Sequence, residues 1–134
     1  MSQIGDELLG LGHLEKLELK FGNYNNLMIN GIKRVGGAIK SMRKLKELSI
    51  LIGDDCNLGS DGAKKIFQGV EECEKLEKFK LHVGKRNQLQ GEGLCMISSG
   101  IGKLKKIKDF DLFIADWNSI GTAGTKSITT NILK

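Results

Sequence analysis

The chain has 134 residues, of which 40% are hydrophobic and 28% charged, a balance typical of one folded domain rather than of a disordered chain. The formal net charge is only +5, and no apolar run approaches the roughly 20 residues that cross a bilayer, so we expect no membrane span. Three cysteines cannot all pair within one chain, which favours a reducing compartment and predicts a cytoplasmic protein. Proline is absent and glycine occurs 18 times, so we expect sharp chain reversals at glycine and asparagine.

Residues 1–13 are predicted to form the second half of a repeating unit. Their apolar residues stand 31 positions before those of the next unit, with Ile4, Leu8 and Leu11 preceding Val35, Ile39 and Met42. The chain therefore opens inside a unit whose first half it does not contain.

Four units follow without any insertion, at residues 14–44, 45–75, 76–106 and 107–134, and together with 1–13 they make one domain spanning 1–134. Apolar residues recur every 31 positions in several columns. Examples are the columns Leu17, Leu48, Phe79, Phe110 and Leu19, Ile50, Leu81, Leu112, and a later column is all glycine, at Gly31, Gly62, Gly93 and Gly124. So regular a pattern predicts that each unit is one supersecondary element.

Each unit changes its periodicity midway. Apolar residues first alternate, as in a strand with one buried face, and later recur with helical spacing. A strand, a loop and a helix, repeated without reversal, predict parallel strands joined by right-handed crossovers, with the all-glycine column at the entrance of each helix. Neighbouring units must stack, because one unit cannot bury its own apolar face.

Written out, the unit reads L-x-x-L-x-L, a loop, and then N-x-L-x-x-x-G, and this pattern resembles the leucine-rich repeat family, in particular its ribonuclease-inhibitor-like class. The asparagine position is filled by Asn25, Cys56, Asn87 and Asn118. The resemblance implies an α/β leucine-rich-repeat solenoid, right-handed, with the parallel sheet on the concave side and helices on the convex side. A buried amide or thiol in that column could bond backbone groups at the bend after the strand. The units are longer than the roughly 20–29 residues usual for the family, which predicts a projecting loop at the rim of the sheet.

No catalytic or metal-binding constellation emerges from the sequence, so we expect no enzyme, no cofactor and no metal. The two histidines, His13 and His82, fall in different phases of the repeat, and neither has a nucleophile at a meaningful spacing. The pair Asp54 and Asp55 lies in a loop whose equivalents in the other units are not consistently acidic, and the cysteines lack a Cys-x-x-Cys partner. The four units carry net charges of +5, −3, +5 and 0, and this alternation argues against a nucleic-acid groove.

A candidate partner-binding patch lies where the strand pattern requires polar residues but apolar ones occur. Leu51 and Phe113 stand on the solvent side of their strands with His82 between them, and the rim loop above contributes Arg86 and Trp117. Tyr24, the only tyrosine, occupies the same loop column. Aromatic residues and arginine are enriched at binding hot spots. The alternative is that Trp117 folds over Phe113 and merely shields the last strand.

The two ends of the repeat offer a second clue, because terminal repeats normally carry polar caps. Here Leu14, Leu17 and Leu19 open the sheet, and Ile128, Ile132 and Leu133 close the chain. Such ends predict either a longer solenoid or packing against another chain.

Taken together, the pattern favours a non-catalytic protein–protein interaction module that binds a protein partner through the concave sheet and its rim loops, with no nucleic-acid or membrane partner. One alternative is a structural subunit of a large assembly, held by its uncapped ends. The resemblance adds a second alternative, a regulator of a small GTPase.

Overall fold

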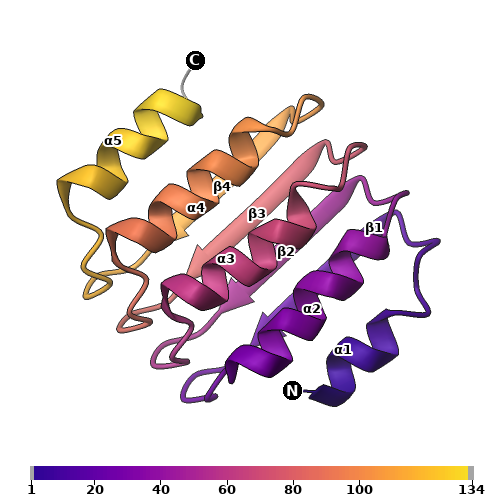
Figure 1. Ribbon diagram of the computed structural model, residues 1–134, viewed down its shortest axis with the longest axis horizontal. Coiled ribbons are helices and arrows are strands. Elements are labelled where there is room, and N and C mark those ends of the chain that lie inside the picture. The colour runs from indigo at the N-terminus through magenta and orange to yellow at the C-terminus, as the bar shows by residue number, and fades with distance from the viewer. Residues whose placement is uncertain (1, 133–134) are drawn as a thin grey trace.

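The computed structural model describes residues 2–132, in which helices alternate with strands along the chain (Figure 1). The helices are α1 (Ser2–Leu8), α2 (Ile29–Ser41), α3 (Gly59–Val70), α4 (Gln90–Gly102) and α5 (Gly121–Asn131). The strands are β1 (Lys16–Phe21), β2 (Glu47–Ile52), β3 (Lys78–Val83) and β4 (Asp109–Ile114). The predicted α/β class and the predicted strand-then-helix order of each unit are confirmed.

The four strands form one parallel sheet in the order β1-β2-β3-β4. Every paired residue lies 31 positions from its partner, as in Leu19↔Ile50 and Ile50↔Leu81. The sequence period is therefore also the register of the sheet, and each column of the repeat is a row of neighbouring side chains across the strands.

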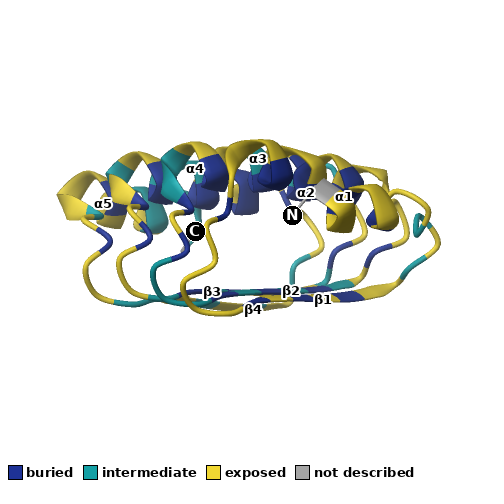
Figure 2. Cartoon of the chain, turned by 90° about the horizontal axis from the view of Figure 1, so that it is seen from below, coloured by how far each residue is buried: buried dark blue, intermediate teal, exposed yellow. Residues whose placement is uncertain are grey.

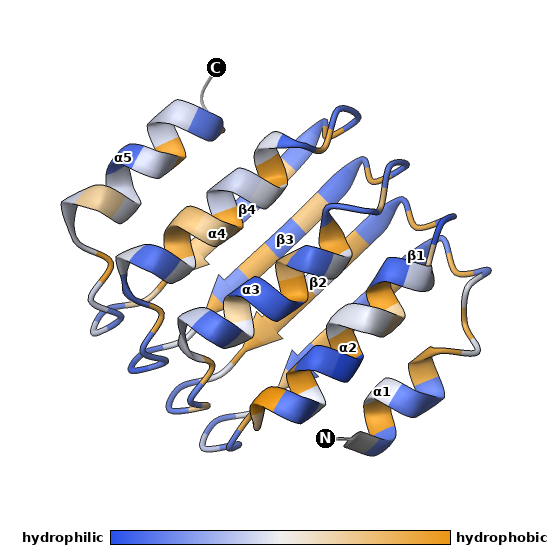
Figure 3. Cartoon of the chain, viewed as in Figure 1, coloured by the Kyte–Doolittle hydropathy of each residue, from blue (hydrophilic) through white to orange (hydrophobic). Residues whose placement is uncertain are grey.

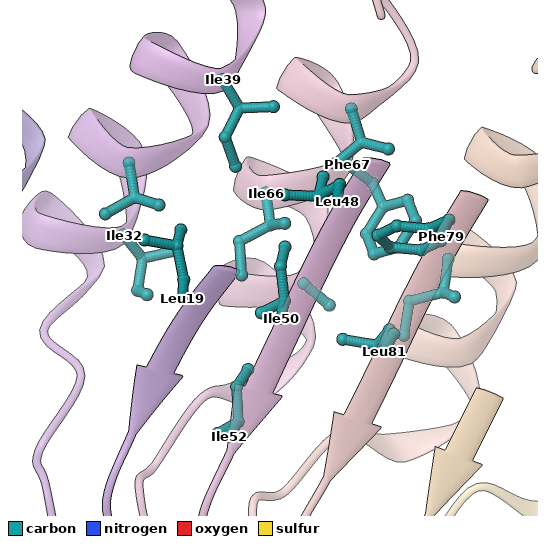
Figure 4. Close-up of a cluster of buried hydrophobic side chains, with 14 of the residues drawn as sticks. Leu19, Ile32, Ile39, Leu48, Ile50, Ile52, Ile66, Phe67, Phe79 and Leu81 are labelled. Carbon is teal, nitrogen blue, oxygen red and sulfur yellow. The ribbon is translucent and has the colours of Figure 1, made fainter. Parts of the chain in front are cut away.

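The helices form one layer over a single face of the sheet, and the other face is open (Figure 2). Alternate strand residues point into the space between the layers, where Ile50 and Leu81 meet Ile66 and Phe67 of α3 (Figure 4). The ring of Phe79 packs edge-on against Phe67 at 5.7 Å and stacks on Phe110 at 5.9 Å. The core is thus a thin continuous layer that no single unit could enclose.

Buried side chains at the bend after each strand link every unit to its neighbours. The Oδ1 atom of Asn87 accepts the Cys56 backbone N–H at 3.1 Å, and its Nδ2 atom donates to the carbonyls of Gly53 at 2.8 Å and Gly84 at 3.0 Å. Asn118 repeats this one unit on, accepting the Asn87 N–H at 3.0 Å and donating to Gly84. These bonds confirm the predicted role of the asparagine column for Asn87 and Asn118, and the Cys56 thiol donates to the Gly22 carbonyl of the preceding unit at 3.0 Å, whereas Asn25 is exposed and bonds only its own loop. We call the three buried members, Cys56, Asn87 and Asn118, the asparagine ladder.

The expectation that chain reversals fall on glycine and asparagine holds only in part, because Asn57, Gly59 and Gly121 have a left-handed backbone near the helix starts but the rim loops use other residues. The left-handed residue of each loop is Tyr24, Asp55, Arg86 or Trp117, with φ between 53° and 67°. The nearby glycines are needed for close packing instead, because a Cβ on Gly84 would lie 2.5 Å from the Gly53 carbonyl carbon. The loop thus holds a large side chain in a conformation that L-residues seldom adopt.

Glycines also allow neighbouring helices to approach closely. A Cβ on Gly36 of α2 would fall on the Lys65 carbonyl oxygen of α3, and a Cβ on Gly69 would fall on the Gly36 carbonyl oxygen. In the all-glycine column, a Cβ on Gly93 would lie 3.2 Å from the Cα of Ser60 in the preceding unit. The predicted crowding at the helix entrance is confirmed there, and the closer backbone contacts lie in mid-helix.

The two ends of the stack differ, although the sequence suggested that both are uncapped. At the N-terminal end, Leu17 and Leu19 are each only 9% exposed, because helix α1 continues the helix layer and buries Leu8 beside them. At the C-terminal end, the inward side chains of β4 are only half-buried, and α5 is mostly pale with separate blue and orange segments (Figure 3). Ile128 and Ile132 are half-buried there, and Leu133 lies outside the described residues.

Replacing Asn87 with alanine should lower the free energy of unfolding by about 2–4 kcal/mol, because it leaves the buried Cys56 N–H and the Gly53 carbonyl without their partner, while the Gly84 carbonyl keeps its hydrogen bond from Asn118. The matched control is Asn25→Ala, since Asn25 is exposed and bonds only the Gly22 carbonyl of its own loop at 2.8 Å. That substitution should cost less than about 1 kcal/mol in urea unfolding. Equal losses for the two variants would contradict the asparagine ladder.

The adjacent glycines of α2 give a second prediction. Gly36→Ala should destabilise the protein by about 1–3 kcal/mol, because its methyl group collides with the Lys65 carbonyl. Gly37→Ala should stabilise it by about 0.5–1 kcal/mol, because a Cβ at Gly37 meets nothing within 4 Å and alanine is the better helix former. Thermal unfolding of both variants checks this pair, and shifts of the same sign would refute the close helix contact.

Candidate functional site

Side chains of both charge signs lie on the open face of the sheet where the strands begin. Lys16 and Lys78 flank Glu47, with N–O distances of 3.1 and 3.5 Å. The hydrogen bond from Lys16 lowers the pKa of Glu47 below its ordinary value. This part of the face is a solvated ionic surface, as its sequence predicted.

Two rows higher, the register places Leu51, His82 and Phe113 side by side on neighbouring strands, as the sequence predicted. Leu51 and His82 are half-buried, whereas Phe113 is 54% exposed. The His82 ring lies 5.6 Å from the Phe113 ring, centroid to centroid, tilted by 58°. Apolar surface is therefore presented to solvent at the β4 end of this row.

His82 is held in place by Asp111 of β4, a contact that the sequence reasoning missed. The His82 Nε2 and Asp111 Oδ2 atoms lie 2.9 Å apart, and this hydrogen bond is the main cause of the lowered pKa of Asp111. Lys80 approaches the same carboxylate at 3.6 Å. Asp111 lies one row below Phe113 on the same strand, so the histidine ring is fixed from below and its apolar side meets Phe113.

The rim loop above fixes Arg86 in the same way. Its Nε and NH2 atoms donate to the two carboxylate oxygens of Asp55 at 2.8 and 2.6 Å. The hydrogen bond lowers the pKa of Asp55 and raises that of Arg86. The sequence contains a signal for this pair, because Asp55 and Arg86 have opposite charges and occupy the same position in adjacent units. The Arg86 guanidinium is thus held in one orientation by the two carboxylate oxygens of Asp55.

Trp117 does not cover Phe113. The indole of Trp117 is 73% exposed while Phe113 stays 54% exposed, so the alternative of a shielding tryptophan is not supported. Tyr24 is 76% exposed, but two whole units separate its loop from that of Trp117. Leu51, His82 and Phe113 are neighbours in one row, and Arg86 and Trp117 occupy equivalent positions in the rim loops after β3 and β4. We call these five residues the rim patch, and Tyr24 lies apart from them.

A shallow hollow of about 220 Å³ lies below the rim patch on the open face. Ser49 stands in its lining, and the Ser49 hydroxyl oxygen is buried without a hydrogen-bond partner among the described residues. The hollow was not predicted from the sequence, because it is formed by the long charged side chains that surround the short Ser49 side chain. Its lining includes Lys16, Glu18, Glu47, Lys78 and Asp111.

Within residues 2–132, no three or more histidine, cysteine, aspartate or glutamate side chains gather as they would around a metal ion. All three cysteines are free thiols. Cys56 and Cys73 are buried, and burial raises the pKa of the Cys73 thiol to about 11. In the same described part of the chain, no helix has the length and apolar character needed to cross a membrane.

No protein-family model matches the chain, and no curated protein sequence matches it either.

Only Cys95 should react with a thiol reagent while the protein is folded. Cys95 is partly exposed on α4, whereas Cys73 is buried and its raised pKa keeps it protonated at pH 8. Mass spectrometry after brief treatment with iodoacetamide should find one labelled cysteine, and three after denaturation. Native labelling of Cys73 as fast as Cys95 would contradict the packing of α3.

Proposed function

We propose that the protein is a right-handed leucine-rich-repeat solenoid that serves as a non-catalytic interaction module. The proposal is supported by the uniform register of the parallel sheet, by the asparagine ladder and by the confinement of the helices to one face. In such a solenoid the open sheet is the concave side, and binding surfaces lie on that side and its rims.

The observation that carries the proposal is the exposure of Phe113 and Trp117 next to polar groups that are already fixed. Single exposed apolar residues are ordinary, but here two large aromatic side chains lie within one five-residue stretch that spans a strand end and its loop. Aromatic residues and arginine supply most of the binding energy in protein interfaces. His82 and Arg86 are held by carboxylates, so a partner need not order them, which lowers the entropy cost of binding.

The partner is a protein that presents an apolar side chain to the Phe113 and Leu51 surface and accepts hydrogen bonds at the rim. No cofactor, nucleic acid or membrane enters the proposal. The lower rows of the open face mix both charge signs in ion pairs, which favours a partner of mixed charge over a polyanion.

A structural subunit of a larger assembly is the second candidate function. It is favoured by the half-buried inward side chains of β4, which leave apolar surface at the C-terminal end of the stack. The two candidates differ in the surface that a partner buries, the rim patch in the first and the C-terminal end in the second.

The double substitution Phe113→Ser and Trp117→Ser should abolish retention of the physiological partner in affinity capture from cell extract. Both side chains are largely exposed, so circular dichroism and the melting temperature should change little. Loss of hot-spot aromatics typically costs 2 kcal/mol or more each, roughly a thirtyfold weakening per residue.

The matched control is Leu9→Ser with Met28→Ser, which removes side chains 55% and 64% exposed and distant from the rim patch. The control should capture the same proteins as the unmodified chain. Retention of every captured protein by the rim variant, with its fold intact, would exclude the rim patch as the binding surface.

A further inference from the structure

The C-terminal end of the stack has the chemistry of a binding site for one more strand. The outer edge of β4 has no partner strand among residues 2–132, because the order of the sheet ends there. Phe110, Leu112 and Ile114 are half-buried, whereas their equivalents on β2 and β3 are buried. We call the β4 edge, these three side chains and the adjoining loop to Asn118 the C-terminal face.

The hydrogen bonds of the asparagine ladder run in one direction and stop at this face. Each backbone N–H in the column donates to the side-chain oxygen of the next unit, from Cys56 to Asn87 and from Asn87 to Asn118. The Asn118 N–H would need an asparagine in a fifth unit, which residues 2–132 do not contain. A second series of bonds also stops at this face. The carbonyls of Phe21, Ile52 and Val83 at the strand ends each accept a backbone N–H of the following unit. The Ile114 carbonyl is the next member of this series.

Charged side chains at the start of the strands also alternate in sign from unit to unit. In one column Glu15, Lys46, Glu77 and Lys108 alternate in sign, with ion pairs of 3.0 Å between Glu15 and Lys46 and between Glu77 and Lys108. In the next column Lys16, Glu47, Lys78 and Asp109 alternate as well. Lys108 and Asp109 therefore end their columns on the outer side of β4, and a following strand would match them with an acidic and then a basic residue.

We propose that the C-terminal face binds an extended segment of a partner protein as a parallel fifth strand. The segment begins with an acidic and a basic residue, which meet Lys108 and Asp109. It continues with alternating apolar residues, which cover Phe110, Leu112 and Ile114. An asparagine after its bend accepts the Asn118 N–H. The main-chain ladder supplies affinity, and the charge pair and the asparagine supply specificity.

The occupant is not an intact second copy of this chain, although β1 carries the required pattern. Each helix packs on the helix of the next unit, and α1 occupies the position before α2 in that layer. If β1 of a second copy paired with β4, its α1 would have to occupy the place of α5. The partner segment must therefore lack a helix at that position, and the isolated β1 segment meets this condition.

A synthetic peptide of residues 14–27 is thus a suitable probe, because it contains Glu15, Lys16, three alternating apolar residues and Asn25. It has no tryptophan, so the fluorescence of Trp117, the only tryptophan of the chain and part of the loop beside this face, reports its binding. We expect a saturable change in Trp117 fluorescence. A peptide with Glu15→Lys and Lys16→Glu should bind at least about threefold more weakly, because two cross-strand pairs become repulsive.

The complementary variant is Lys108→Glu with Asp109→Lys. Both positions are exposed, so the loss of the Lys108–Glu77 ion pair and the like charges placed opposite Glu77 and Lys78 should cost only about 1 kcal/mol per pair and leave the protein folded, which circular dichroism checks. It should reverse the preference, binding the charge-reversed peptide at least about threefold more tightly than the original one. No saturable binding of the original peptide, or equal binding of both peptides to both proteins, would overturn the proposal. The rim patch would be unaffected by that result, because Phe113 and Leu51 lie on the open face of the sheet and not at its edge.

Discussion

The buried side-chain amide at the bend after each strand is the interaction on which the other features depend. A parallel strand that turns sharply toward a helix leaves backbone N–H and C=O groups inside the layer, where no water reaches them. Asn87 satisfies three such groups at once, one in its own unit and two in the preceding one. It thereby holds neighbouring units in one register, in which paired strand residues are 31 positions apart in the sequence. Cys56 can replace only part of what an asparagine does at this position. Its thiol donates to the Gly22 carbonyl at 3.0 Å, but it has no amide oxygen that could accept a backbone N–H from the preceding unit.

Because these bonds point one way along the stack, its two ends are chemically different. The N-terminal end has an asparagine, Asn25, that is exposed and bonds only its own loop. The C-terminal end has a backbone donor, at Asn118, for which residues 2–132 contain no following unit. Glycines such as Gly36 and Gly69 set the helix spacing that the bends require, so an added methyl group in mid-helix would separate units that the ladder holds together. Close packing in the helix layer and hydrogen bonding of buried polar groups at the ends of the strands thus require the same spacing between units.

Much of the fold could be predicted from the sequence, because periodicity is a property of residue types alone. The columns of Leu17 and Leu19 predicted the strands, their parallel pairing and the row that joins Leu51 to Phe113. Side-chain geometry could not be predicted in this way. The hydrogen bond between His82 and Asp111 and the left-handed backbone of Trp117 depend on how side chains and loops of neighbouring units pack together. The difference between the two ends was also missed, since it depends on where one short helix lies.

Amide hydrogen exchange of the native protein tests the central claim most directly. The account predicts that the backbone N–H groups of Cys56 and Asn87, which donate to asparagine side chains, exchange only with global unfolding. The equivalent N–H of Asn118 should exchange many times faster, because the chain described here supplies no next asparagine. Similar slow exchange at all three positions, or fast exchange at Cys56 and Asn87, would contradict the claim that a directional asparagine ladder holds the units together.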